Sequence, residues 1–222
     1  SPLPKGMLYS RWDLNYAYTN LSIARQTLID AAWPGTSGLT ANDNVSAGNE
    51  WEKLVDDDTP LATYNYSYIP TDEAHVQYSV LLTNYFEQIG VKIGLIGLTR
   101  GEYYYKLLRG GMEFYSSAWG AAFNDPVEIF NPLYLTNAPF NYANISDTQT
   151  DNWIIEGLGE RNETAREQIY YNIQKRLVEE LYPVLWTHSQ VRWDMWASNV
   201  KGIPTEGANI KFILKYAFLE DS

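Results

Sequence analysis

The fold class is decided by residues 61–119, LATYNYSYIPTDEAHVQYSVLLTNYFEQIGVKIGLIGLTRGEYYYKLLRGGMEFYSSAW. Two runs of β-forming residues, 61–69 and 91–97, flank a segment whose apolar residues recur at helical spacing. A short helix over 100–109 and a further strand over 112–119 are predicted next. Strands that alternate with helices favour a parallel sheet, because parallel neighbours need crossover connections. We therefore predict an α/β fold, with a mostly parallel sheet covered by helices on both faces.

The segments around these strands refine the prediction. Helical spacing of apolar residues predicts helices over 20–32 and 72–88, and Gly90 follows the second helix where a left-handed cap belongs. Residues 34–60 hold Pro, Gly, Ser and Asn together with three consecutive Asp residues. We interpret this stretch as a solvated loop rather than a calcium site, because no ligand spacing with a glycine turn follows the Asp residues.

The C-terminal third contains the strongest helix signal, over residues 164–182. Thr164 and Glu167 form a capping-box pattern at its start, and Pro183 ends it. Beyond this helix we expect β-structure in the stretches 184–190, 191–196 and 210–218. The last of these stretches has no obvious partner within the chain.

Composition excludes several classes of function. The chain has 222 residues and a net charge of −11, so it offers no basic surface that could neutralise nucleic-acid phosphates. It has no cysteine and two histidines, which excludes disulfides, thiolate metal sites and a multi-histidine metal site. No apolar run approaches the roughly 20 residues of a membrane-spanning helix. We expect no nucleic-acid partner, no metal and no cofactor.

The sequence contains no recognisable catalytic motif. Neither G-x-S-x-G nor a phosphate-binding loop is present. His188 falls in a predicted buried strand beside Trp186, and we interpret it as a core or rim histidine rather than a catalytic base. His75 falls in the first turn of a predicted helix, where we expect it in solvent. The sequence therefore predicts no catalytic residue and no enzyme, and its many carboxylates leave a glycosidase pair open without singling one out.

The stretch 116–126, SSAWGAAFNDP, is the most informative local pattern. A strand runs into Trp119, small residues follow, and Asp125 with Pro126 can start a helix. In open α/β sheets, ligands bind in turns beyond the carboxyl ends of strands. The pattern fits such a binding turn and a purely structural strand-to-helix turn equally well.

Element order and residues together resemble the C-terminal lobe of the family 5 extracellular solute-binding proteins, the oligopeptide, dipeptide and nickel receptors of ABC importers. The resemblance covers residues 20–205, with the tail 206–222 outside it. Three stretches carry it: residues 23–32 (IARQTLIDAA), residues 82–126, and the pattern of Arg166, Tyr170, Gln174, Glu179, Glu180 and Pro183 ending at Asn199-Val-Lys-Gly202.

This resemblance implies a hinged, two-lobed protein that binds a peptide or another small solute between its lobes and delivers it to a membrane permease. Residues 1–222 would then form the C-terminal ligand-binding lobe, and the tail 206–222 would return to pack on a missing N-terminal lobe. The chain starts with Ser-Pro-Leu-Pro and no Met, so we expect it to be part of a longer protein. The resemblance places that protein outside the cytoplasm, in the periplasm or at the cell surface, anchored to the membrane through the missing part.

One residue departs from the family pattern. Peptide-binding members have an Asp that holds the peptide ammonium group, and the matching position here is Ala122. A buried ammonium without a counter-ion is costly, so a peptide with a free amino terminus needs a substitute such as Asp125 or a carboxylate of the other lobe. The high aromatic content also suits a neutral ligand such as an oligosaccharide.

We predict the ligand contacts of this lobe as follows. Trp119 provides apolar stacking, Phe123 forms a wall, and Asn124 forms hydrogen bonds with the ligand. Asp125 caps the helix or pairs with a cation. The loop 141–146 adds two further candidates, Tyr142 and Asn144.

Two other readings remain beside the solute-binding one. A carbohydrate-active hydrolase domain predicts a close carboxylate pair in an aromatic cleft. A protein-interaction module predicts a large exposed apolar face. The last reading overlaps the first, since a single lobe exposes the surface that meets its other half, and a homodimer of the fragment through that surface is compatible with both.

Overall fold

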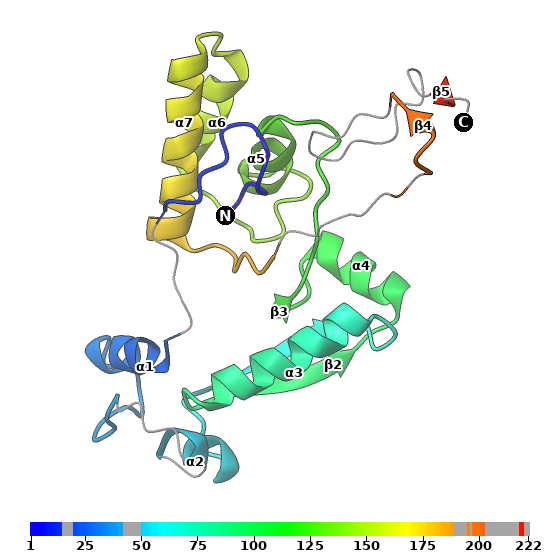
Figure 1. Cartoon of the computed structure of the whole chain (residues 1–222). Coiled ribbons are helices and arrows are strands. Elements are labelled where there is room, and N and C mark those ends of the chain that lie inside the picture. The colour runs from blue at the N-terminus through cyan, green and yellow to red at the C-terminus, as the bar shows by residue number, and fades with distance from the viewer. Residues whose placement is uncertain (15–19, 42–49, 189–194, 196, 203–217, 220–222) are drawn as a thin grey trace. The chain divides into compact units, whose positions relative to one another are not determined.

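The computed structural model describes residues 1–14, 20–41, 50–188, 195, 197–202 and 218–219 (Figure 1). The chain divides into two compact units. Unit 1 consists of residues 1–17 and 119–222, and unit 2 consists of residues 18–118. Unit 2 is therefore continuous in sequence, whereas unit 1 is assembled from the two ends of the chain. That residues 1–222 make up one lobe stays a prediction.

Unit 2 is built on a three-stranded parallel sheet with the order β2-β1-β3. The central strand β1 (Ala62–Tyr68) pairs along its whole length with β2 (Val91–Gly97), in the register Ala62 opposite Val91. On its other side, β1 pairs with β3, which consists of Phe114–Tyr115 alone. The predicted parallel α/β fold is confirmed, and the predicted strand over 112–119 is reduced to these two paired residues.

Helix α3 (Glu73–Glu87) packs on one face of this sheet, as Figure 1 shows. The alternate residues of β1 that face this side are tyrosines, and Tyr66 is almost fully buried. Helical spacing brings Tyr78, Leu82 and Phe86 of α3 against them. The Tyr66 hydroxyl donates a hydrogen bond to Ser116 Oγ at 3.0 Å, so this buried polar group is satisfied.

The helices of unit 2 have clear sequence signals at their ends. Asn20 caps α1 (Leu21–Asp30), and Asp72 caps α3. Helix α4 (Arg100–Arg109) begins with a capping box in which Thr99 and Glu102 satisfy each other's main-chain N–H groups. Gly90 has φ +75°, a conformation that a side chain disfavours, and it makes the turn from α3 into β2.

Helix α2 (Glu50–Asp56) lies inside the segment that the sequence predicts as a loop, so that prediction is wrong for these residues. Burial of Trp51 explains the helix. Its indole N–H donates to the Thr40 carbonyl at 2.8 Å, and the Arg25 guanidinium lies 5.5 Å from its ring centroid. Arg25 is itself buried and donates to the Gln88 carbonyl.

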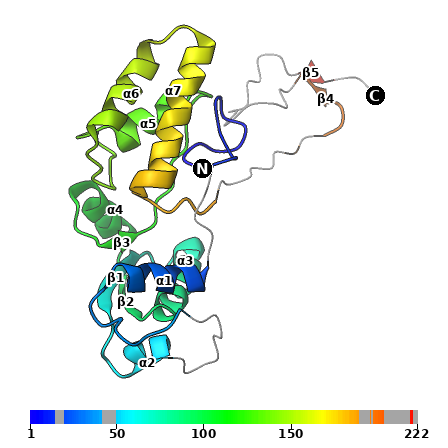
Figure 2. The same cartoon turned by 90° about the vertical axis from the view of Figure 1, so that its left-hand side faces the viewer.

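Unit 1 contains three helices among its described residues, α5 (Val127–Tyr134), α6 (Thr148–Gly159) and α7 (Glu163–Arg176). A π-helical turn, η1 (Leu177–Leu181), continues α7. Figure 2 shows α6 and α7 side by side, and their apolar faces share one core with the N-terminal segment. Leu3 and Met7 of that segment are buried in this core.

Gln174 of α7 forms hydrogen bonds with the N-terminal segment, residues 1–14. Its side chain is fully buried, and its Nε2 donates to the carbonyls of Tyr9 and Tyr170 at 3.0 Å each. Its Oε1 accepts a hydrogen bond from the Arg11 amide at 3.0 Å. The buried amide is therefore satisfied by main-chain groups, two of which, at Tyr9 and Arg11, lie far from it in the sequence.

Two further predictions for unit 1 are corrected, and one of its helices was not predicted. Asn162, not Thr164, caps α7, because its side chain accepts from the Ala165 amide; helix α6 lacks a sequence prediction altogether. Residues 184–188 form no strand, and the Trp186 indole instead donates to the Tyr134 hydroxyl at 3.0 Å. Residues 189–194 and 196 lie outside the described part.

The tail has a partner within the chain. Strand β5 (Phe218–Leu219) pairs antiparallel with β4 (Val200–Lys201), a pairing that the sequence did not indicate. The rest of the predicted strand, 210–217, lies outside the described residues.

Candidate functional site

Trp119 belongs to an aromatic cluster in unit 1. Its indole N–H donates to the Glu128 main-chain carbonyl at 2.7 Å, which fixes the ring against the first turn of α5. The Phe140 ring centroid lies 4.9 Å from that of Trp119, and Tyr142 meets Phe140 edge-on at 6.0 Å. Trp119 nevertheless stays 38 % exposed, so the cluster presents an open aromatic surface.

Phe123 and Asn124 extend this surface along the loop that leads into α5. The Phe123 side chain is 52 % exposed. The Asn124 side-chain oxygen accepts a hydrogen bond from the Leu8 amide at 2.8 Å. The Asn124 side-chain oxygen, which the sequence predicts to contact a ligand, thus binds the N-terminal segment instead.

Asp125 is paired within the protein. Its Oδ1 accepts from the Val127 amide at 3.0 Å, which fulfils the predicted stabilisation of the helix start, although Pro126 is the residue at the cap position. The same oxygen lies 2.9 Å from a guanidinium nitrogen of Arg166. The cation that Asp125 pairs with is therefore a residue of its own chain.

Arg166 is held on several sides. It donates to the Gly157 carbonyl at 2.9 Å, and its guanidinium lies 5.0 Å and 5.6 Å from the ring centroids of Tyr170 and Tyr9. The hydrogen bond that Arg166 donates to Asp125 raises the pKa of Arg166 further above its ordinary value, against the opposing effect of burial. The pair therefore joins the start of α5 to α6, α7 and the N-terminal segment as a structural element.

The second loop with predicted site residues is shaped by Asn141. Its side chain donates to the Leu135 and Ile145 carbonyls and accepts from the Ile145 amide. These hydrogen bonds shape a loop in which Tyr142 lies beside Phe140 and Asn144 is in the left-handed region at φ +49°. Tyr142 therefore joins the aromatic cluster, whereas the contacts of Asn144 that the structure gives are those of a turn.

Two residues of this region were not predicted from the sequence. Phe140 completes the aromatic cluster, and no local pattern distinguishes it from a core residue. Glu128 lies in the first turn of α5, and its Oε2 accepts the Ala122 amide at 2.9 Å. The spacing Asp125-Pro-x-Glu128, typical of a helix start with acidic residues in the first turn, is the signal that could have found it.

The two histidines differ from their predicted settings. His75 lies in the first turn of α3 as predicted, but it is half-buried rather than solvated. Its Nδ1 accepts from the Ile69 amide at 3.3 Å, and Tyr103 lies edge-on to its ring. His188 is exposed, on residues that form no strand, and contacts Thr187 at 3.3 Å.

The described residues show limited signs of other sites. No cluster of three or more His, Asp or Glu side chains in this part of the chain could hold a metal ion. None of the described helices is long and apolar enough to cross a membrane. A shallow depression of about 380 Å³ lies on α4 and is lined by Gly101, Glu102, Tyr105 and Lys106, none of which is a predicted site residue.

Comparison with known proteins gives matches at the level of structure. No protein-family model matches the sequence, and no curated protein matches it. HbpA2 from Haemophilus parasuis is 15 % identical with a TM-score of 0.71, and the match covers 99 % of this chain and 39 % of HbpA2. The ABC transporter-associated periplasmic binding protein DppA from Helicobacter pylori, in complex with the peptide STSA, is 16 % identical with a TM-score of 0.70, over 99 % of this chain and 38 % of DppA.

A third match agrees with these two. The dipeptide-binding protein from Pseudoalteromonas sp. SM9913, in complex with Met-Leu, is 16 % identical with a TM-score of 0.64, over 99 % of this chain and 39 % of that protein. The chain thus spans less than two fifths of the length of each of these proteins. It has the fold of the ABC-transporter substrate-binding proteins, the family that its sequence resembles.

Proposed function

We propose that this chain belongs to the solute-binding component of an ABC importer, which binds a peptide or another small solute and delivers it to a membrane permease. The observation that carries the proposal is the structural match over 99 % of the chain to two binding proteins that hold peptides. The match spans both units and follows the element order from which the family resemblance was drawn.

The chemistry of unit 1 supports a binding role. Trp119 and Phe123 are exposed aromatic side chains on a loop that is fixed by two hydrogen bonds, one from its main chain to α5 and one between the Asn124 side chain and the N-terminal segment. A rigid loop with exposed rings suits stacking on an apolar ligand, because little conformational entropy is lost on binding. A receptor of this kind needs contacts that favour its closed form and no bond-breaking group.

The partners and the location follow from the same proposal. A second lobe of the complete protein closes over the ligand, a permease in the membrane receives it, and the protein works outside the cytoplasm. Membrane attachment through a part of the protein outside these residues completes the proposal.

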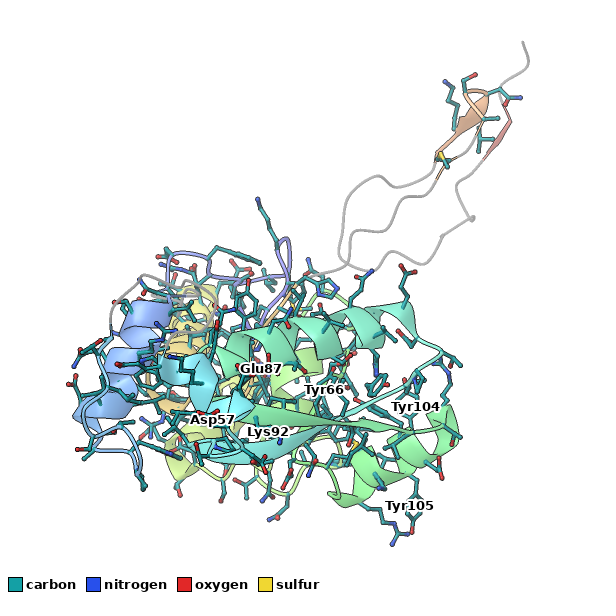
Figure 3. All side chains as sticks on the ribbon, turned by 90° about the horizontal axis from the view of Figure 1, so that it is seen from below. Asp57, Tyr66, Glu87, Lys92, Tyr104 and Tyr105 are labelled. Atoms are coloured by element: carbon teal, nitrogen blue, oxygen red, sulfur yellow. The ribbon has the colours of Figure 1, made fainter. Side chains whose placement is uncertain are left out.

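A second candidate, a protein-interaction module, is favoured by the surface of unit 2. Helix α3 exposes Val80, Leu81 and Tyr85, and α4 exposes Tyr104, Tyr105 and Leu108. Figure 3 shows Tyr105 directed away from α4 into solvent. Soluble proteins usually expose only scattered apolar side chains. So many on two helices that follow each other in the chain are typical of a surface that binds another protein.

A thermal-shift screen of the complete gene product separates the two functions. The screen uses free dipeptides, longer peptides and linear oligosaccharides, each at millimolar concentration. A ligand at about 100 times its Kd stabilises the protein by about 2.7 kcal/mol, which raises the Tm by several degrees. A saturable shift with one class supports the receptor. No shift with any class, together with a stable protein complex in sedimentation, overturns the receptor in favour of the interaction module.

A further inference from the structure

Five acceptor sequences for N-linked glycans occur in the chain. Each consists of an Asn, any residue other than Pro, and then a Ser or Thr, and about two would be expected by chance from the content of these residues. They begin at Asn20, Asn44, Asn65, Asn144 and Asn162. Asn44 lies outside the described residues, and the other four differ in what their side chains contact.

Three of these four Asn side chains have a structural role. Asn20 and Asn162 cap α1 and α7, because each side-chain oxygen accepts a main-chain N–H of the first helical turn at 3.0 Å. Asn65 belongs to the central strand β1, and its side chain lies against Gly94 of β2, where an added Cβ would meet Asn65 Oδ1 at 2.6 Å. The hydroxyl of its acceptor sequence belongs to Ser67, which is buried. An enzyme therefore has no access to that hydroxyl in the folded protein.

Asn144 differs from these three residues. It is exposed and lies in a turn with φ +49°, where its main-chain N–H donates to the Asn141 carbonyl at 3.0 Å. Ser146 carries the hydroxyl of this acceptor sequence and is exposed as well. Among the described residues, neither of these two side chains has a hydrogen-bond partner. The Asn141 side chain fixes the loop through its hydrogen bonds to Leu135 and Ile145, so both acceptor groups lie on an ordered, accessible turn.

Attachment of a glycan needs both of these groups. The transferring enzyme must reach the Asn side-chain amide and the hydroxyl two residues later. The amide Nδ2 attacks C1 of a sugar that a membrane lipid carries on a phosphate or pyrophosphate. The bond between C1 and the phosphate oxygen breaks, and its electron pair leaves with the lipid phosphate. Nδ2 loses one proton and forms the new bond to C1, so the reaction needs no oxidant or reductant.

We infer that Asn144 is a glycosylation site, which receives an oligosaccharide from a lipid-linked donor. The assignment rests on the proposed function, because such glycans are found on the surface loops of proteins that leave the cytoplasm. Asn144 then serves as a modified surface residue rather than as the ligand contact predicted from the sequence, and Tyr142 stays in the aromatic cluster.

The test compares hydroxyl variants of the complete protein, recovered separately from the cytoplasm, the cell envelope and the culture medium of its own organism. Ser146→Ala removes the acceptor hydroxyl and keeps Asn144 with its turn, whereas Ser146→Thr keeps a hydroxyl. Thr148→Ala removes an exposed hydroxyl two positions further along and serves as the control. Tandem mass spectrometry of the chymotryptic peptide 143–153 measures the mass added at Asn144, and the peptide that contains Asn65 is measured with it.

We expect the added mass of an oligosaccharide on peptide 143–153 in the wild type, Thr148→Ala and Ser146→Thr, its loss in Ser146→Ala, and no added mass at Asn65. An unmodified Asn144 in protein from the envelope or the medium overturns the inference and leaves the receptor function standing. A glycan that persists in Ser146→Ala, or one found at Asn65, also overturns the inference alone. Recovery of the protein from the cytoplasm only overturns both the inference and the proposed location.

Discussion

At the scale of single residues, Asp147 shows how one side chain can stabilise two elements. Its carboxylate caps α6 by accepting the Thr150 amide, and it receives two hydrogen bonds of 2.7 Å from the Arg176 guanidinium at the end of α7. Both side chains are largely buried, which strengthens the ion pair compared with one on the surface. The hydrogen bonds from Arg176 hold the pKa of Asp147 well below its ordinary value of 3.8.

Replacing Asp147 therefore weakens unit 1. We expect Asp147→Asn, which keeps a capping oxygen, to lower the free energy of unfolding by about 1–2 kcal/mol, and Asp147→Ala by about 2–3 kcal/mol. Because the folded-state pKa is depressed, the stabilisation is present above pH 3.8 and is lost as the pH falls toward the folded-state pKa.

Urea denaturation at pH 7 and pH 3 measures this effect. Asp13→Asn is the control, since Asp13 also pairs with an arginine, Arg11, but in solvent. The control should leave the urea midpoint nearly unchanged. Equal losses in Asp13→Asn and Asp147→Asn would contradict the role assigned to burial.

At the scale of elements, the turn from α3 into β2 depends on Gly90. With φ at +75°, the residue adopts a conformation that L side chains disfavour, and a Cβ placed there would meet Leu54 Cδ1 at 3.0 Å. The turn sets the register of β2 against β1, because Val91 pairs directly with Ala62. Backbone strain at this position therefore acts on the whole sheet of unit 2.

We expect Gly90→Ala to lower the free energy of unfolding of unit 2 by about 1–2 kcal/mol. Gly101→Ala is the control in α4, where a Cβ meets nothing within 4 Å and alanine favours helix, so that a gain of up to about 1 kcal/mol is expected. Thermal denaturation followed by circular dichroism compares the two. A gain in both variants would show that the left-handed conformation is not required.

His75 links the start of α3 to the end of β1 in a pH-dependent way. Its Nδ1 must be unprotonated to accept the Ile69 amide. Burial lowers the pKa of His75 below its ordinary value of 6.5; Asp72 opposes this shift and Arg100 adds to it. The stabilisation is complete above pH 6.5 and is lost as the pH falls toward the lower folded-state pKa.

This linkage predicts a difference between the histidines. The urea midpoint of the wild type should decrease when the pH is lowered from 7.5 to 5.5. His75→Gln should show a smaller decrease, whereas His188→Gln, at an exposed position, should show the same decrease as the wild type. An unchanged pH dependence in His75→Gln would remove His75 as its source.

Element prediction succeeded where local sequence determines the structure. The strands β1 and β2, the helix α3 and the turn at Gly90 follow from alternation, helical spacing and a glycine that is needed at positive φ. Prediction failed for α2 and for residues 184–188, where the decisive contacts are distant. Trp51 bonds to Thr40, and Trp186 bonds to Tyr134, whose pKa burial raises to about 12.

The candidate site was predictable in part for the same reason. Trp119, Phe123 and Tyr142 carry chemistry that is visible in the sequence, and the structure places the rings of two of them, Trp119 and Tyr142, against Phe140. The ion pair of Asp125 was not predictable, because it depends on Arg166, 41 positions after Asp125. The sequence shows which side chains are charged, whereas only the fold shows which of them form ion pairs.

At the scale of the whole molecule, unit 1 needs both ends of the chain and unit 2 needs only its own residues. Leu3 and Met7 contribute buried apolar surface to the core of α5, α6 and α7. Each such side chain is worth about 1.5–3 kcal/mol of burial. The stability of unit 1 is therefore tied to a segment whose described residues, 1–14, form no helix or strand.

Deletion of residues 1–11 should destabilise unit 1 by about 3–6 kcal/mol and leave unit 2 intact. Hydrogen exchange followed by mass spectrometry measures the two units separately. We expect amides of α5 and α7 to lose protection and amides of β1 and β2 to keep it. Lys5→Ala, at an exposed position of the same segment, is the control and should change neither. Loss of protection in both units would contradict their independence.

The discontinuity of unit 1 has a consequence for synthesis. A ribosome adds roughly 5–20 residues per second, and Gln174 follows its partner Tyr9 by 165 positions. Residues 1–11 must therefore wait roughly 8–33 seconds for the helix that shelters them, while residues 18–118 can finish folding in the interval. During that wait Leu3 and Met7 lack the core that buries them, and a chaperone that binds exposed apolar segments would act on this part of the chain.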